Sequence, residues 1–102
     1  MADQTIIKKA EQFLKQIPKE LGLKKSYLFG SYAKGNQHED SDIDIAVVLE
    51  NTNDFYTNQM LLMKLRRNID LRIEPHPINE KDFTIHNPFA YEIQLTGIAL
   101  EF

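Results

Sequence analysis

The chain is 102 residues long, which is the usual size of one compact domain, and we expect a single domain over residues 1–102. Its 42% hydrophobic and 26% charged residues are typical of a folded globular protein rather than a disordered one, and its net charge of −3 lacks the cationic excess on which bulk DNA or RNA binding depends. There is no cysteine, no signal-peptide pattern and no apolar run near the ~20 residues that span a bilayer, so we expect a cytoplasmic protein without membrane contact.

The first third of the chain predicts a helix, a strand and a loop. Apolar residues recur at helical spacing over 6–17, with Lys, Glu and Gln between them, and Pro18 is expected to end the helix. Residues 25–29 form a short predicted strand that runs into Gly30, and the polar residues 34–40 are expected to form a loop.

The middle of the chain predicts a buried strand, a helix and a third strand. Residues 42–49, Asp-Ile-Asp-Ile-Ala-Val-Val-Leu, begin as an alternating pattern and become continuously apolar, which is typical of a strand buried on both faces with its first end at a polar site. Residues 51–54 supply turn and N-cap chemistry for a helix over about 55–67. Residues 68–74, Asn-Ile-Asp-Leu-Arg-Ile-Glu, alternate cleanly, so a third strand is expected there, stopped by the two prolines that follow.

The last third of the chain predicts one more helix. Asn87 is a good N-cap residue, and Pro88 suits the first helical position. Gly97 is expected to end this helix in a left-handed conformation, and residues 98–102 follow as a short extended piece. This order of elements indicates an α/β (α+β) domain in which helices flank a small mixed sheet.

The Asp-x-Asp pair at the start of the central strand, Asp42 and Asp44, carries the first chemical signal. Alternate residues of a strand point to the same face, so the two carboxylates project side by side, and a proton, a basic neighbour or a cation must offset their repulsion. Carboxylate oxygens suit Mg²⁺ and Mn²⁺. A third carboxylate, Asp70 on the predicted third strand, would complete a site for two metal ions if these strands pair.

The Gly30-Ser31 turn carries the second signal. Glycine allows the backbone to approach a ligand closely, and a short helix from Ser31 through Lys34 would present free backbone N–H groups to an anion. The Ser31 hydroxyl can also donate to a phosphate oxygen. Phosphate on one wall and metal-binding carboxylates on the other would make a site for ATP or another nucleoside triphosphate.

The two motifs together resemble the DNA polymerase β-like nucleotidyltransferase superfamily, whose motif is Gly-Ser, about ten residues, Asp-x-Asp and a later strand aspartate. Ten residues separate Ser31 from Asp42 in this chain. The short length is similar to the minimal nucleotidyltransferase branch, which in bacteria and archaea is often encoded beside a helical HEPN-type ribonuclease and serves as its antitoxin. The resemblance covers essentially the whole chain and implies the polymerase beta-like nucleotidyltransferase fold.

The resemblance implies a role for each of five residues. Gly30 and Ser31 would bind the triphosphate, and Asp42 and Asp44 would bind two Mg²⁺ ions. Asp70 would be the third carboxylate, binding metal and helping to deprotonate the acceptor hydroxyl. Glu74 is a second candidate for that role; it lies on the same face of the predicted strand, roughly 13 Å further along.

Each of these residues also has a simpler structural interpretation. The aspartate pair could cap the start of a strand, Gly30 could end one, and Asp70 could be a strand residue paired with Arg72. Tyr32 could stack on a base or pack beneath the turn. The three histidines show no metal-ligand spacing, and we expect none of them to bind a metal.

The resemblance favours an enzyme that transfers AMP from Mg-ATP to a hydroxyl of an acceptor, with pyrophosphate as the other product. The expected acceptor is a partner protein such as a HEPN toxin, docked by the partner itself or by a second copy of the chain in a homo-oligomer. Two alternatives stay open: an antitoxin or adaptor that neutralises its partner by binding without catalysis, and a metal-dependent phosphohydrolase that uses the same carboxylates.

Overall fold

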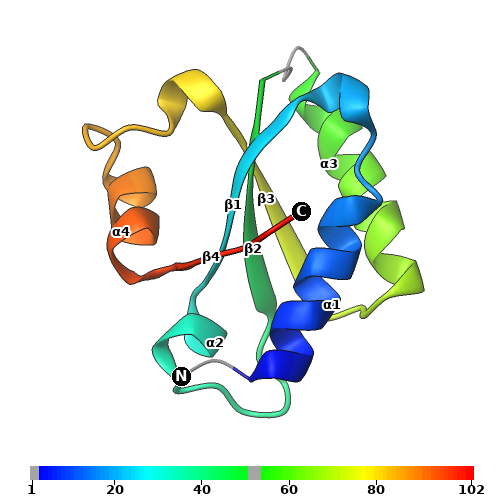
Figure 1. Cartoon of the computed structure of the whole chain (residues 1–102), viewed down its shortest axis with the longest axis vertical. Helices are drawn as coiled ribbons and strands as arrows, with labels where there is room; N and C mark the ends of the chain where they lie inside the picture. Colours follow the sequence, from blue (N-terminus) through cyan, green and yellow to red (C-terminus); the bar gives the residue numbers. More distant parts are fainter. Residues whose placement is uncertain (1–2, 51–53) are drawn as a thin grey trace.

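The computed structural model describes residues 3–50 and 54–102, and a mixed four-stranded sheet forms the middle layer of the molecule (Figure 1). The strands lie in the order β3-β2-β1-β4 across the sheet. β1 (Leu23–Phe29) pairs antiparallel with β2 (Ile43–Leu49) and with β4 (Ile98–Ala99), whereas β3 (Ile73–Asn79) runs parallel to β2. The predicted α/β architecture with a small mixed sheet is therefore confirmed.

Helices cover both faces of this sheet. α1 (Gln4–Lys15) and α3 (Phe55–Leu65) lie against one face, and α4 (Pro88–Thr96) lies against the other (Figure 1). The four-residue α2 (Ser31–Lys34) follows β1 directly, at one end of the sheet. Three 3-10 helices complete the connections: Lys19–Leu21, Arg66–Asn68 and Glu80–Asp82. Within the described residues, no helix has the length and apolar character needed to cross a membrane.

β2 separates two hydrophobic clusters and is the centre of the fold. Its odd-numbered residues, Ile43 to Leu49, pack with α1 and α3, while Ala46 and Val48 pack with α4. Every residue of this strand is buried except Asp44, which is half-buried near the first end. The predicted strand with two buried faces and a polar first end is confirmed.

Side-chain caps define where three helices begin. The carboxylate of Asp3 accepts a hydrogen bond from the Thr5 amide at 2.8 Å, and the carboxylate of Asp54 caps α3. Asn87 accepts hydrogen bonds from two amides in the first turn of α4, as the Asn-Pro pair predicted. The other residues of the predicted turn before α3, 51–53, lie outside the described residues.

The predicted third strand is present, but its predicted bounds of 68–74 are wrong. Residues 66–68 form a 3-10 helix, residues 69–72 form turns, and β3 begins at Ile73 and passes through both prolines that were expected to stop it. Alternation alone placed the start of the strand too early: it assigned Leu71 to the core face, whereas this side chain is 67% exposed.

β3 tolerates its prolines because it is an edge strand. Successive residues of a strand direct their backbone N–H and C=O groups to opposite sides, so Pro75 and Pro77, two positions apart, share one side. The position of the missing N–H faces away from β2 at both of them. α3 and the 3-10 helix after it bond to this edge: the Gln59 amide donates to the Pro75 carbonyl at 3.3 Å, and the Arg66 guanidinium donates to the Ile73 carbonyl at 3.0 Å.

The predicted left-handed cap at Gly97 is also wrong, because Gly97 is extended with φ −79° and ψ 166°. A Cβ atom there would lie 2.5 Å from the Ile93 carbonyl oxygen and 3.2 Å from the Leu28 carbonyl oxygen. Glycine is needed at this position chiefly because a Cβ atom would clash with the Ile93 carbonyl oxygen of α4 itself, and it would also press on the backbone of β1.

Candidate active site

Three neighbouring strands bring the candidate site residues to one end of the sheet. Phe29 of β1 is the register partner of Asp44 on β2, and Asp44 is in turn the register partner of Glu74 on β3. Gly30 and Ser31 follow Phe29 directly, so the predicted phosphate-binding turn starts beside the aspartate pair. The sheet register therefore joins sequence motifs that lie more than ten residues apart.

Gly30 and Asp44 are in direct contact. Gly30 has φ 75° and ψ −150°, a conformation that is essentially restricted to glycine. A Cβ atom on Gly30 would lie 2.4 Å from Asp44 Oδ2, which is closer than two such atoms can approach. Glycine at this position allows the turn and the carboxylate to form one site.

α2 begins at Ser31, as the sequence predicted. The Gly30 carbonyl accepts hydrogen bonds from the amides of Ala33 and Lys34, both at 3.1 Å, which closes the first turn of this short helix. The first amides of a helix have no acceptor inside that helix and suit an anionic ligand. Tyr32 packs into the core with 5% of its surface exposed, so the alternative in which it lies beneath the turn is confirmed.

Asp44 lies on the face of the sheet on which α4 packs, because it alternates with Ala46 and Val48 along β2. Asp42 is exposed just before β2, while the Asp44 side chain is 24% exposed. Asp44 Oδ1 lies 3.0 Å from His76 Nε2, and the His76 ring contacts the Phe29 ring with centroids 4.9 Å apart. His76 is thus a site residue that the sequence analysis missed, although it stands only two residues after Glu74 in the alternation of β3.

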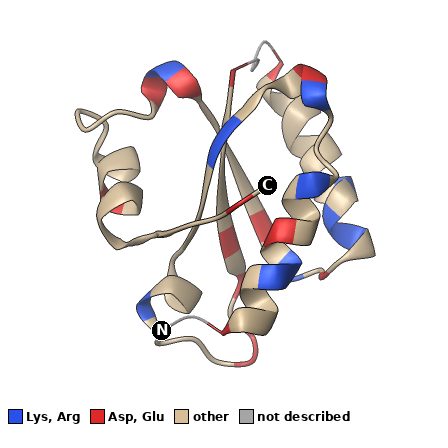
Figure 2. Ribbon diagram, viewed as in Figure 1, with Lys and Arg blue, Asp and Glu red and all other residues tan. Residues whose placement is uncertain are grey.

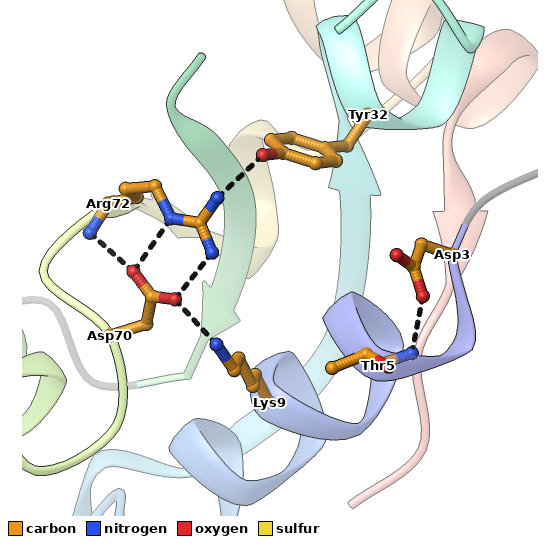
Figure 3. A network of polar contacts seen from close by, with 6 residues as sticks. All are labelled: Asp3, Thr5, Lys9, Tyr32, Asp70 and Arg72. Carbon is orange, nitrogen blue, oxygen red and sulfur yellow. Dashed lines mark hydrogen bonds and ion pairs between the residues drawn. The ribbon is translucent and has the colours of Figure 1, made fainter. Parts of the chain in front are cut away.

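Asp70 is not on a strand beside the aspartate pair, contrary to the prediction. It lies in the turn before β3, where its carboxylate binds Arg72 through two side-chain hydrogen bonds of 3.0 and 2.7 Å and Lys9 through one of 2.9 Å (Figure 3). The bonds from Arg72 hold the pKa of the Asp70 carboxyl well below its ordinary value, against the opposing effect of burial. The pairing with Arg72 that the alternative interpretation proposed is confirmed, but its placement of Asp70 on a strand is wrong.

Glu74 occupies the place that was expected of Asp70. It is adjacent to Asp44 in the parallel register of β2 and β3, and register partners of a parallel pair point to the same face. Its side chain is 39% exposed, and Oε2 lies 3.9 Å from an Arg66 guanidinium nitrogen. Glu74 is therefore the β3 carboxylate that is next to the Asp-x-Asp pair.

The acidic side chains of the candidate site are of the chemical type that binds a hard divalent cation. Asp42, Asp44 and Glu74 offer the carboxylate oxygens that Mg²⁺ and Mn²⁺ prefer. Within residues 3–50 and 54–102, no three acidic or histidine side chains are gathered closely enough to hold a metal ion. Figure 2 shows acidic residues on the lower parts of β2 and β3 and along the loop below them, whereas many of the basic residues lie on α1 and α3.

An open groove of about 360 Å³ borders the site on its β3 side. Glu74 and His76 form its polar part, and Phe55 of α3 and Phe89 of α4 form aromatic walls. Phe89 is 47% exposed, and its ring centroid lies 5.6 Å from that of Phe29. The site is therefore bounded by the Gly-Ser turn on the β1 side and by this groove on the β3 side.

A mixed sheet with a Gly-Ser turn beside an Asp-x-Asp pair at the start of its central strand is the arrangement that the sequence resemblance predicted for a nucleotidyltransferase domain. The chain matches the family model described as "Polymerase beta, Nucleotidyltransferase" over residues 8–100, and it therefore belongs to this family of enzymes.

Two named relatives and two solved structures are similar to the chain. It is 46% identical over 48 residues to the protein adenylyltransferase MntA of Shewanella oneidensis, a match that covers 47% of this chain and 34% of MntA. The chain thus spans about a third of the length of MntA. It is 37% identical over 87 residues to the "Putative protein adenylyltransferase MJ1379" of Methanocaldococcus jannaschii, covering 83% of this chain and 80% of that protein.

The solved structures extend the similarity to three dimensions. A toxin-antitoxin structure with AMP-PNP superposes with a TM-score of 0.68 at 31% identity, over 93% of this chain and 72% of that chain. A structure from Sulfolobus solfataricus superposes with a TM-score of 0.58 at 24% identity, over 76% of this chain and 69% of that chain, and shows the fold alone.

Proposed function

We propose that this chain transfers AMP from Mg-ATP to a hydroxyl of a partner protein and thereby acts as the antitoxin of a HEPN-type toxin. The support is the family, the relatives named as protein adenylyltransferases and the similar toxin-antitoxin structure with AMP-PNP. The observation that carries the proposal is the contact between Gly30 and Asp44, because it makes the phosphate turn and the carboxylates two walls of one site.

The role of each residue would follow from its position in the sheet. The amides and hydroxyl at Ser31 would hold the β- and γ-phosphates, while Asp42, Asp44 and Glu74 would hold divalent cations. Mg²⁺ or Mn²⁺, when bound, neutralises the charge that develops on the transferred phosphoryl group. We assign the third-carboxylate role to Glu74 rather than to Asp70, because Glu74 is next to Asp44 and Asp70 is bound by Arg72 and Lys9.

The acceptor would approach from the β3 side. In nucleotidyl transfer the acceptor oxygen attacks the α-phosphorus roughly in line with the bond that breaks, and pyrophosphate leaves on the opposite side. The Gly30-Ser31 turn lies on the β1 side of Asp44, so the acceptor belongs on the other side, where Glu74 and the groove lie. The Glu74 carboxylate would receive the proton of the acceptor hydroxyl as the new P–O bond forms.

A transfer assay tests this function. The protein is incubated with ATP labelled at the α-phosphate, Mg²⁺ and the proteins that co-purify with it, in parallel with the Asp42→Asn/Asp44→Asn variant. The matched control is Asp40→Asn, which removes an exposed acidic side chain from the neighbouring loop. We expect a labelled protein band with the wild type and with Asp40→Asn, and none with the double variant.

Two other outcomes would replace the proposal. An unlabelled partner that still co-purifies, together with measurable ATP binding, would indicate a non-catalytic antitoxin or adaptor. Release of labelled AMP without any labelled acceptor would instead indicate a phosphohydrolase that uses the same carboxylates.

A further inference from the structure

A second polar network joins three elements beside the candidate site (Figure 3). The Lys9 ammonium on α1 donates to Asp70 Oδ2 at 2.9 Å, and Arg72 donates to both oxygens of the same carboxylate. The remaining nitrogen of the Arg72 guanidinium donates to the Tyr32 hydroxyl on α2 at 2.9 Å. The guanidinium therefore connects the turn before β3 to the helix that begins at Ser31.

The geometry of this network restricts how far its members can move. Asp70 is 11% exposed at its side chain and also accepts from the Arg72 backbone amide at 2.9 Å, so the pair is closed by three bonds. Two parallel N–H···O bonds fix the plane of a guanidinium in a way that one exposed ion pair does not. The Tyr32 side chain is held at both ends, because its ring is buried in the core and its hydroxyl accepts the hydrogen bond from Arg72.

Arg72 also contacts the strand that carries the aspartates. Its carbonyl accepts a hydrogen bond from the amide of Ile43 at 2.8 Å, and Ile43 stands between Asp42 and Asp44. Through its side chain Arg72 reaches Tyr32, the residue after Ser31. One residue is therefore hydrogen-bonded to the neighbours of both walls of the site.

We propose that Arg72 is a positioning residue. Asp70 and Lys9 hold its side chain in place, and Arg72 in turn fixes α2 through Tyr32. This contact sets the Gly30-Ser31 turn against Asp44 before a nucleotide binds. This inference rests on the proposed function for the identity of the ligand. A site that is already arranged loses less free energy to ordering when the ligand binds. Loosening the network therefore weakens nucleotide binding without removing any group that contacts the nucleotide.

The first test is Tyr32→Phe, which removes the hydroxyl and keeps the buried ring. Arg72 is 37% exposed at its side chain, so water can satisfy the freed nitrogen and the fold is preserved. We expect the Kd for Mg-ATP, measured by titration calorimetry, to rise about tenfold, which corresponds to about 1.4 kcal/mol. The turnover at saturating ATP should stay close to the wild-type value, since uniform binding is what is lost.

The matched control is Tyr27→Phe, another partly buried tyrosine, which lies on β1 with its ring against Phe83. We expect this variant to bind Mg-ATP as the wild type does. Equal Kd values for wild type, Tyr27→Phe and Tyr32→Phe would overturn the proposal and leave the network a purely structural one.

Amide hydrogen exchange separates this inference from the proposed function. Exchange at the α2 amides should be faster in Tyr32→Phe than in Tyr27→Phe, whether or not any nucleotide is present. If the wild type fails to bind Mg-ATP but α2 shows this difference, the proposed function is wrong and the positioning of α2 stands. If α2 exchanges equally in both variants, the positioning itself is refuted.

Asp70→Asn and Glu74→Gln distinguish a positioning residue from a metal ligand. As part of the network, Asp70→Asn should behave like Tyr32→Phe, with a higher Kd for Mg-ATP and nearly unchanged turnover. Glu74→Gln should lower turnover by orders of magnitude. A loss of turnover in Asp70→Asn as large as that in Glu74→Gln would contradict the inference and return Asp70 to the role of third carboxylate.

Discussion

Replacing Gly30 by alanine tests whether the phosphate turn and the aspartates form one site. The backbone at Gly30 has φ 75° and ψ −150°, which costs a non-glycine residue about 1–3 kcal/mol. The added Cβ would lie 2.4 Å from Asp44 Oδ2, whereas ordinary contact begins at 3.4 Å, so the carboxylate must retreat by about 1 Å. A misplacement of that size in a catalytic constellation lowers rates by roughly 100-fold.

The control for this prediction is Gly35→Ala. Gly35 also has a positive φ, 77°, but a Cβ there would meet no atom within 4 Å. We expect Gly30→Ala to lower Tm by roughly 4–20 °C and transfer of labelled AMP by roughly 100-fold. Gly35→Ala should lose no activity at a temperature where both variants are folded. Equal activities of the two variants under that condition would refute the proposed contact between turn and carboxylate.

The remaining predictions concern a helix cap, an ion pair and a hydrogen bond to the site. Asn87→Ala should destabilise the protein by about 1 kcal/mol in chemical denaturation, because it removes the cap of α4. Arg72 lowers the pKa of the Asp70 carboxyl in the folded state. The stabilisation from this carboxylate is therefore complete above about pH 4 and is lost as the pH falls further. The difference in unfolding free energy between wild type and Asp70→Asn should accordingly shrink from pH 5 to pH 2. His76→Leu removes the hydrogen bond to Asp44 and should weaken Mn²⁺ binding, measured by electron paramagnetic resonance, by roughly 10- to 100-fold. His86→Leu, on the exposed connection before α4, should leave that binding unchanged.

The sequence could predict those parts of the fold whose causes are local. A cap such as Asn87 before Pro88 acts within one turn of helix, so the start of α4 was correctly predicted. The pattern from Asp42 to Leu49 predicted a doubly buried strand, because a central strand has apolar neighbours on both faces whatever its partners are. The Gly30-Ser31 turn followed from backbone freedom alone.

The errors came largely from causes that are not local. Prolines stop a central strand but not an edge strand, and the position of β3 at the edge is known only once the strand order is known. Alternation over 68–74 suggested a strand. An alternating pattern fixes the position of a strand only where its apolar residues pack on a core, and Leu71 is exposed instead. The Gly97 error has a partly local cause, because the nearest atom to a Cβ there is the Ile93 carbonyl oxygen of the same helix, and only the next nearest belongs to β1.

The choice between Asp70 and Glu74 follows from the same register. Both are acidic, both stand near the third strand in sequence, and they lie four positions apart, so strand alternation cannot choose between them. Beginning β3 at Ile73 rather than at residue 68 moves Asp70 off the strand and places it with Lys9 and Arg72. The same shift places Glu74 beside Asp44. The neighbouring cationic side chains also distinguish the two carboxylates. Asp70 is bound by Arg72 and Lys9 and has little remaining capacity for a metal ion. Glu74 has one distant contact with Arg66, at 3.9 Å, and remains free to bind a metal ion.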